Sequence, residues 1–170
     1  MNTYESSHIS PIHHVRRLTE NDIPCILSLC QSNQLYYQYY PPIATASSIL
    51  QDLHALPPNK TSQDKYFMGY FDVADLLVAV LDLILGYPND QTAFIGFFMT
   101  DVSFQGQGVG SEIIEHLCTA LRQHGYQTVR LGWVQGNPQS EHFWRKNHFS
   151  VIGSSSNRAG PIITLAERDL

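Results

Sequence analysis

The stretch Phe94–His124, FIGFFMTDVSFQGQGVGSEIIEHLCTALRQH, decides the fold that this sequence predicts. Its first residues, Phe94–Thr100, are apolar and rich in aromatic side chains, which is typical of a strand buried in a sheet. Its last part, 111–124, carries apolar residues at intervals of three and four, which form one face of a helix. Three glycines at alternate positions lie between the strand and the helix: Gly106, Gly108 and Gly110.

This glycine loop allows two interpretations from its residues alone. Glycine has no side chain, so backbone N–H groups can approach a ligand closely, and the start of a helix adds unpaired N–H donors and a positive dipole end. These features predict a cradle for an anion such as a phosphate group. The alternative is a turn that only reverses the chain.

Two familiar phosphate loops do not fit these residues. A Rossmann fingerprint needs G-x-G-x-x-G and an acidic residue at the end of the next strand, but Ser111 stands at the third glycine position and Trp133-Val134-Gln135 follows that strand. A Walker loop needs Gly-Lys-Ser/Thr after the glycines, and this is absent.

A second motif lies further along the chain, at Asn137–Phe149, NPQSEHFWRKNHF. It is similar to the segment Asn-x-x-Ala/Ser-x-x-Phe-Tyr-x-Lys-x-Gly-Phe of the GNAT superfamily of acetyltransferases. The loop itself matches Gln/Arg-x-x-Gly-x-Gly/Ala of the same superfamily, with Gln105, Gly108 and Gly110 in the fixed places. Together with the strand before and the helix after the loop, the two motifs make the chain resemble a member of this family.

The resemblance implies an α/β fold, with a mixed central sheet of six to seven strands flanked by four helices. We expect a flexible leader over residues 1–14 and a single domain over 15–170. The hydrophobic patterns predict strands near 15–18, 65–71, 76–85, 94–100, 128–133, 149–153 and 162–165, and helices near 23–30, 46–56, 111–124 and from Asn137 onward. The first strands should form an antiparallel meander, and the strands on either side of the glycine-loop helix should be parallel.

The resemblance also implies acetyl-coenzyme A, or a related acyl-coenzyme A, as co-substrate. The residues implied to bind it are Phe98, Met99 and Thr100 for the pantetheine arm, Gln105, Gly106, Gln107, Gly108, Val109, Gly110 and Ser111 for the pyrophosphate, and Asn137 for the arm again. Backbone N–H groups and the helix start can hold a pyrophosphate with little charge from side chains.

The reaction implied is direct attack of an amine on the thioester, for which a base must take a proton and the leaving thiolate needs a donor. Trp144 replaces the family tyrosine that often protonates the thiolate, and an indole N–H can donate a hydrogen bond but is no acid near neutral pH. Three alternatives follow for the leaving thiolate: Trp144 only stabilises it, Ser140 or water supplies its proton, or no acid is needed because a thiolate leaves well. For Trp144 itself, the other interpretation is a core aromatic side chain.

Asp101 is the candidate base, because it directly follows the strand that is expected to bind the coenzyme. Glu141 and His142 at the start of the last helix are further candidates, and each of these groups can instead be an ordinary surface side chain. His148 replaces the usual glycine before Phe149, a position where histidine and asparagine tolerate left-handed backbone geometry.

An unusual density of tyrosine occurs at Asn33–Pro42, NQLYYQYYPP. One interpretation is a packed loop between two helices, with the rings as core filler. The other follows from the resemblance, since this region commonly shapes the acceptor pocket of the family, where aromatic faces can hold an ammonium group.

Composition excludes several other functions. The net charge of −5 and the absence of a basic stripe argue against nucleic acid, and no apolar run reaches the length of a membrane span. Cys25, Cys30 and Cys118 lack a CxxC spacing, so reduced thiols without a metal are expected. The polar start is unlike a signal peptide, which favours a cytoplasmic protein.

The sequence thus predicts an N-acetyltransferase for a primary amine of a small molecule or a protein, without nucleic-acid or membrane partners and with homodimerisation through terminal strands as an open option. Two rivals remain at this point. One is a sensor that binds acyl-coenzyme A but has lost transfer activity, and the other is a phosphate-loop protein unrelated to coenzyme A.

Overall fold

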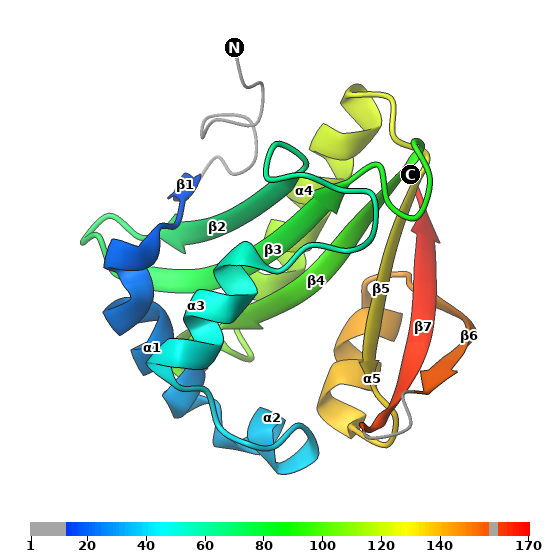
Figure 1. The fold of residues 1–170 in the computed structure, drawn as a ribbon. Helices are drawn as coiled ribbons and strands as arrows, with labels where there is room; N and C mark the ends of the chain where they lie inside the picture. The colour runs from blue at the N-terminus through cyan, green and yellow to red at the C-terminus, as the bar shows by residue number, and fades with distance from the viewer. Residues whose placement is uncertain (1–12, 157–159) are drawn as a thin grey trace.

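A computed structural model describes residues 13–156 and 160–170 of the chain, and these residues form one seven-stranded sheet with helices on both faces (Figure 1). The strand order is β1-β2-β3-β4-β5-β7-β6. The strands are β1 (His14–Arg17), β2 (Lys65–Phe71), β3 (Leu77–Leu85), β4 (Thr92–Thr100), β5 (Thr128–Val134), β6 (Ser150–Ser156) and β7 (Ile162–Asp169). The helices are α1 (Ile23–Ser32), α2 (Gln34–Tyr39), α3 (Ala46–His54), α4 (Val109–Gln123) and α5 (Pro138–Lys146).

The predicted strand directions are confirmed. β1 to β4 pair antiparallel in chain order, and β4 and β5, on either side of α4, are parallel. A bulge interrupts the β3–β4 ladder, because Asp82 lies opposite Phe97 while Leu83 lies opposite Ile95. Gly96 is therefore the extra residue on β4.

Two hydrophobic clusters hold the layers together. On one face, α4 buries the predicted stripe of Ile113, Ile114, Leu117, Cys118 and Leu121 against the sheet, and α5 adds Trp144 to the same cluster. On the other face, α1 and α3 pack on β2, β3 and β4, as the front of Figure 1 shows. Gly125, with φ of 88°, ends α4 in the left-handed conformation, as predicted.

Three details of the sequence prediction are corrected by the structure. The tyrosine-rich segment is not a loop throughout, because residues 34–39 form the short helix α2, which raises the number of helices among the described residues to five. His14 belongs to β1 rather than to a leader, and residues 1–12 lie outside the described part of the chain. α4 begins at Val109, two residues before the expected start, because Gly108 is its N-cap.

The three cysteines are unpaired thiols, as predicted. Within residues 13–156 and 160–170, no cluster of histidine, cysteine and carboxylate side chains has the arrangement of a metal site. In the same ranges, none of the helices has both the length and the apolar character that crossing a bilayer requires.

Candidate functional site

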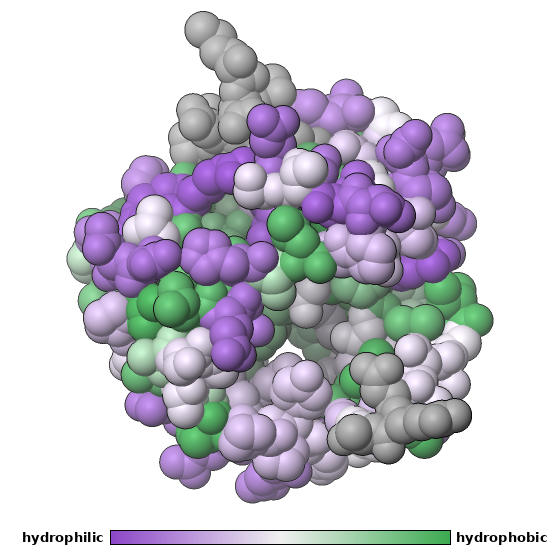
Figure 2. Space-filling model, in the orientation of Figure 1, coloured by the Kyte–Doolittle hydropathy of each residue, from purple (hydrophilic) through white to green (hydrophobic). Residues whose placement is uncertain are grey.

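β4 and β5 pair only at one end. Their ladder runs from Thr92 to Ile95 on β4 and from Thr128 to Leu131 on β5, although β4 continues to Thr100 and β5 to Val134. Beyond Ile95 the two strands diverge, as Figure 1 shows, and the space-filling view has a hollow in this region of the same face (Figure 2). The split between β4 and β5 therefore exposes the backbone edge of each strand inside the molecule.

The free edge of β4 belongs to alternate residues. The N–H of Asp101 donates to the carbonyl oxygen of Val78 on β3, 2.8 Å away, so by strand alternation Met99 also directs its backbone groups to β3. Phe98 and Thr100 consequently face the split. Met99, whose side chain is buried against α1 and α3, cannot offer backbone groups to a ligand there, and we leave it out of the binding set.

The glycine loop takes the conformation that an anion cradle requires. Gly106 and Gly108 have φ of 74° and 86°, and a Cβ atom at either position would meet nothing within 4 Å, so backbone geometry rather than space selects glycine there. No backbone N–H from Gly106 to Ser111 donates a hydrogen bond to a described residue. These donors converge on the N-terminus of α4, where the helix dipole also favours an anion.

Gly110 is glycine for a different reason. A Cβ atom there would lie 3.1 Å from Cε2 of Phe143, so the absence of a side chain lets α4 and α5 pack closely. Ser111 has its hydroxyl group 3.2 Å from Nδ2 of Asn147, from which it accepts a hydrogen bond. Val109 is the first residue of α4 and packs on the core at its edge.

Gln105 ties three parts of the site together. Its Nε2 donates to Oδ1 of Asn33 at the end of α1 and to the carbonyl oxygen of Thr100, at 2.7 and 3.2 Å. Its Oε1 accepts from Gln139 at the start of α5, at 3.4 Å. Gln107 is two residues further along the loop, and its Nε2 donates to the carbonyl oxygen of Ser103 at 2.7 Å.

Asn33 is a site residue that the sequence analysis missed. It is buried, and its Nδ2 donates to the carbonyl oxygens of Leu29 and Thr100, at 2.9 and 3.1 Å. Its contacts to Thr100 and Gln105 span 67 and 72 residues of sequence, so no local pattern could have indicated them.

Asn137 has one half of its amide in use. The side chain is 1% exposed, and its Oδ1 caps α5 by accepting from the backbone N–H groups of Gln139 and Ser140, at 3.1 and 3.2 Å. Its Nδ2 donates to no described residue. An amide N–H that is free of described partners next to the end of β5 is a donor that a ligand in the split can use.

Trp144 belongs to an aromatic cluster on the α4 and α5 side of the split. Its ring centroid lies 4.9 Å from that of Phe143, 5.2 Å from Phe149 and 5.9 Å from Phe98 on β4. The residue is 7% exposed, and its indole N–H donates to no described residue. Trp144 is thus a core aromatic by packing. Ser140, in the first turn of α5, is partly exposed.

The candidate bases are all engaged or at the surface. Oδ1 of Asp101 accepts from the backbone N–H of Ser103 at 2.8 Å and also from its hydroxyl, which makes it the cap of the short turn after β4. Glu141 pairs with Arg145 at 2.9 Å on the exposed side of α5, where His142 is also exposed.

His148 and Cys118 both have a clear structural reason. His148 has φ of 68°, the left-handed geometry that histidine tolerates in place of the family glycine. Burial raises the pKa of Cys118 to about 11, so this side chain stays a neutral thiol in the core and is no nucleophile.

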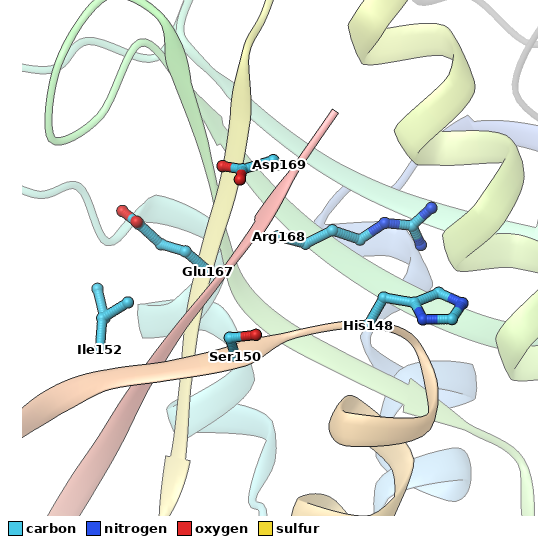
Figure 3. Close-up of a pocket in the computed structure, with 6 residues that line it drawn as sticks. All are labelled: His148, Ser150, Ile152, Glu167, Arg168 and Asp169. Atoms are coloured by element: carbon cyan, nitrogen blue, oxygen red, sulfur yellow. The ribbon is translucent and has the colours of Figure 1, made fainter.

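A separate pocket lies on the β6–β7 hairpin, bordered by His148, Ser150, Ile152, Glu167, Arg168 and Asp169 (Figure 3). Arg168 is committed to structure, since it donates to the carbonyl oxygen of Asn147 and to Oε2 of Glu115, at 3.3 and 2.7 Å. None of the predicted site residues borders this pocket.

The fold and the two sequence motifs can now be compared with known proteins. The sequence model of the acetyltransferase (GNAT) family matches residues 29–149, more than half of the chain. The chain belongs to the GNAT acetyltransferase family. It is therefore an acyltransferase, as predicted.

Solved GNAT structures share this fold. An acetyltransferase from Thermus thermophilus superposes with a TM-score of 0.77 at 21% identity, over 96% of this chain and 100% of that one. The acetyl transferase from Salmonella typhimurium that modifies the N-terminal serine of ribosomal protein L7/L12 gives a TM-score of 0.70 at 20% identity, over 95% and 97%. A ribosomal L7/L12 alpha-N-protein acetyltransferase in complex with coenzyme A gives 0.68 at 19%, over 95% and 96%. No curated protein matches the sequence.

Proposed function

We propose that this GNAT protein transfers an acetyl group from acetyl-coenzyme A to a primary amine of a small molecule or a protein. One observation carries the proposal: the unpaired backbone N–H groups of residues 106–111 lie at the end of β4, whose free edge leads from them into the split. An anion site joined to an open strand edge fits a ligand with a pyrophosphate at one end and an extended amide-containing arm.

The residues present fit coenzyme A. The loop from Gln105 to Gly110 and the start of α4 at Ser111 would hold the pyrophosphate, with Gln105 fixing the loop through its side chain. From the β4 side, Phe98 would pair with the amides of the arm, and Thr100 would add only its N–H because its carbonyl oxygen already accepts from Asn33 and Gln105. The free Nδ2 of Asn137 would donate from the β5 side. The coenzyme supplies an acetyl thioester, which is open to attack by an amine.

The protein's own contribution to proton transfer is sparse around the thioester. The indole N–H of Trp144 is no acid near neutral pH, and Ser140, whose backbone N–H donates to the Asn137 cap, is the hydroxyl residue of α5. A thiolate is a good leaving group, so a hydrogen-bond donor or a water molecule is sufficient there. Asp101 stays a predicted base, although its carboxylate already accepts two hydrogen bonds from Ser103.

A protein acceptor draws support from related structures, because two of the neighbours named above act on the N-terminus of a ribosomal protein. The rival function is a sensor that binds acyl-coenzyme A without transfer, which Trp144 in place of tyrosine favours. A cytoplasmic location and a homodimer remain predictions, and gel filtration tests the latter.

Thermal melting with acetyl-coenzyme A, coenzyme A, ATP and NAD tests the proposal, followed by thiol release across a panel of amines. A ligand at about 100 times its Kd stabilises the folded state by ~2.7 kcal/mol, which raises the Tm measurably. We expect a shift with both coenzymes, none with ATP or NAD, and thiol release with at least one amine. A shift without release favours the sensor, and no shift with either coenzyme contradicts the proposed ligand.

A further inference from the structure

A buried ion pair lies on the α1 and α3 side of the sheet. Nζ of Lys65 on β2 contacts Oδ2 of Asp82 on β3 at 2.8 Å, and the two residues are 6% and 9% exposed. Lys65 also lies over the ring of Phe67, 5.5 Å from its centroid. Burying two charges costs solvation energy that the pair itself seldom recovers in full, so the presence of the pair is weak evidence for a purely stabilising role.

Asp82 has an oxygen without a partner. Its Oδ1 is buried and accepts no hydrogen bond from a described residue, whereas buried carboxylates usually have both oxygens bonded. The small exposed part of the Asp82 side chain therefore belongs to atoms other than Oδ1. Burial raises the pKa of this carboxyl, Lys65 opposes the rise, and the charge of Asp52 on α3 adds to it. Asp82 thus holds a proton more firmly than an ordinary aspartate.

This carboxylate lies at the vertex of the split. Gly96 directly follows Ile95, the last residue of β4 that pairs with β5. A Cβ atom at Gly96 would lie 2.8 Å from Oδ2 of Asp82, so the exposed glycine of the bulge is the residue against which the carboxylate rests. If the glycine loop holds the pyrophosphate, an arm that pairs along the free edge of β4 would extend from Thr100 toward this vertex.

Aromatic side chains continue the site from the bulge toward α2. Tyr36 packs edge-on against Phe97, the residue after Gly96, with ring centroids 6.2 Å apart, and against Tyr37 at 5.0 Å. Burial is the main cause that raises the pKa of both tyrosines, and the charge of Asp52 contributes in each case. Aromatic faces beside carboxylates suit an ammonium group attached to an apolar body.

We propose that Asp82 receives the amino group of the acceptor at the β4 bulge, and that the acceptor is a primary amine with an apolar or aromatic group next to it. This inference rests on the proposed acetyltransferase function. The acceptor enters from the α2 side, its apolar part lies on Tyr36 and Phe97, and its nitrogen contacts Oδ2, which can accept from Lys65 and from the acceptor at once. Lys65 is a positioning residue.

The proton steps balance as follows. The ammonium group gives one proton to the Asp82 carboxylate, and the neutral nitrogen then forms the amide bond to the acetyl carbon while the bond from that carbon to sulfur breaks. The second proton that the nitrogen loses restores the coenzyme thiol. Asp82 returns its own proton to solvent, and the charge of Lys65 speeds this return by favouring the carboxylate.

The test compares amine binding in wild type and in Asp82→Asn, with coenzyme A saturating. The probes are 2-phenylethylamine, a short peptide with an N-terminal phenylalanine, and 2-phenylethanol, which lacks the ammonium group. We expect a Tm shift with at least one amine and none with the alcohol. Loss of a hydrogen bond to a charged group should weaken amine binding about 10- to 100-fold in Asp82→Asn. The surface variant Asp90→Asn should bind like wild type.

The outcomes separate this inference from the proposed function. If coenzyme A shifts the Tm but no amine does, or if Asp82→Asn binds the amine as wild type does, the inference is overturned and the proposed function survives. If coenzyme A itself gives no shift, both fail. The peptide and the small amine tell a protein acceptor from a metabolite. If Asp82→Asn does not fold, the double variant Lys65→Met/Asp82→Val replaces it, with the same loss expected.

A pH profile tests the proton role separately. Thiol release with the probe that binds should show an acidic limb in wild type that is absent in Asp82→Asn, where no carboxylate is left to titrate at this position. An acidic limb that persists in Asp82→Asn, or that disappears in Asp101→Asn instead, overturns the role of Asp82 as proton acceptor. A probe that binds without thiol release overturns it as well.

Discussion

Replacement of Lys65 by methionine leaves the Asp82 carboxylate buried without its cation. Methionine keeps the length and most of the volume of the lysine side chain, so the change removes the charge and the 2.8 Å contact more than the packing. Breaking one partner of a buried ion pair costs about 3–5 kcal/mol, because the remaining charge is left uncompensated. We expect a loss of this size at pH 7.5.

The loss should depend on pH with a defined sign. In Lys65→Met the pKa of Asp82 rises further, so the folded state binds a proton more tightly than the unfolded state, in which an aspartate has a pKa of ~3.9. The free energy of unfolding therefore falls as pH rises from the pKa of Asp82 in the unfolded state to its raised pKa in the folded state. The slope is up to ~1.4 kcal/mol per pH unit for one proton. The destabilisation is largely absent near pH 4 and complete above the raised pKa.

Urea denaturation between pH 4.5 and 7.5 measures this, with fluorescence of the buried Trp133 and Trp144 as signal. Lys60→Met is the matched control, because Lys60 and Asp64 form a looser pair at 3.7 Å with more exposed side chains, and such pairs contribute about 0–1 kcal/mol. The double variant Lys65→Met/Asp82→Val should recover most of the lost stability. If Lys65→Met lowers the free energy of unfolding by less than ~1 kcal/mol, and by the same amount at pH 4.5 and pH 7.5, the reasoning is refuted.

Three further predictions concern the coenzyme site. Gly108→Ala should destabilise the protein by about 1–2 kcal/mol through backbone strain alone, since no atom lies near its Cβ position, and should lower its Tm by ~2–8 °C; an unchanged Tm would contradict the left-handed geometry. Asn137→Ala should lose both the α5 cap, at about 1 kcal/mol, and coenzyme affinity, whereas Asn137→Ser should keep the cap and lose only affinity, as urea denaturation and coenzyme titration can distinguish. Trp144→Phe should cost about 1–3 kcal/mol in packing and leave the thiol-release rate per folded molecule nearly unchanged, and a large drop in that rate would assign the indole N–H a direct role.

The sequence was most informative where the pattern is local. β4, the glycine loop and α4 lie in one continuous stretch of the sequence, and periodicity with glycine chemistry suffices to predict each of them. The apolar run at 76–85 predicted a strand, and β3 forms there with its central residues buried. The antiparallel meander and the parallel β4–β5 pair follow from short connections and from the handedness of the crossover.

What the sequence could not predict depends on distant contacts. α2 has too few residues for a helical period, so its tyrosines resembled a loop. The length of the β4–β5 ladder depends on how two layers pack, and no residue marks Ile95 as its last member. Asp82 stands alone among apolar neighbours of β3, a signal that could have been noticed, but its partner lies 17 residues earlier on another strand.

The split also affects how the sheet avoids association with other molecules. An unpaired strand edge can recruit another chain, and proteins protect such edges by keeping them short, charged or covered. The outer edges here are modest, since β1 is four residues long with Arg16 and Arg17, and β6 is rich in serine. The edge of β4 from Gly96 onward is apolar and aromatic, so it is the edge that would aggregate most readily. It faces β5 across the split and is therefore inside the sheet rather than at its outer border. The split between β4 and β5 can accept a single extended ligand arm. It offers no open sheet edge along which a strand of a second molecule could add to the sheet.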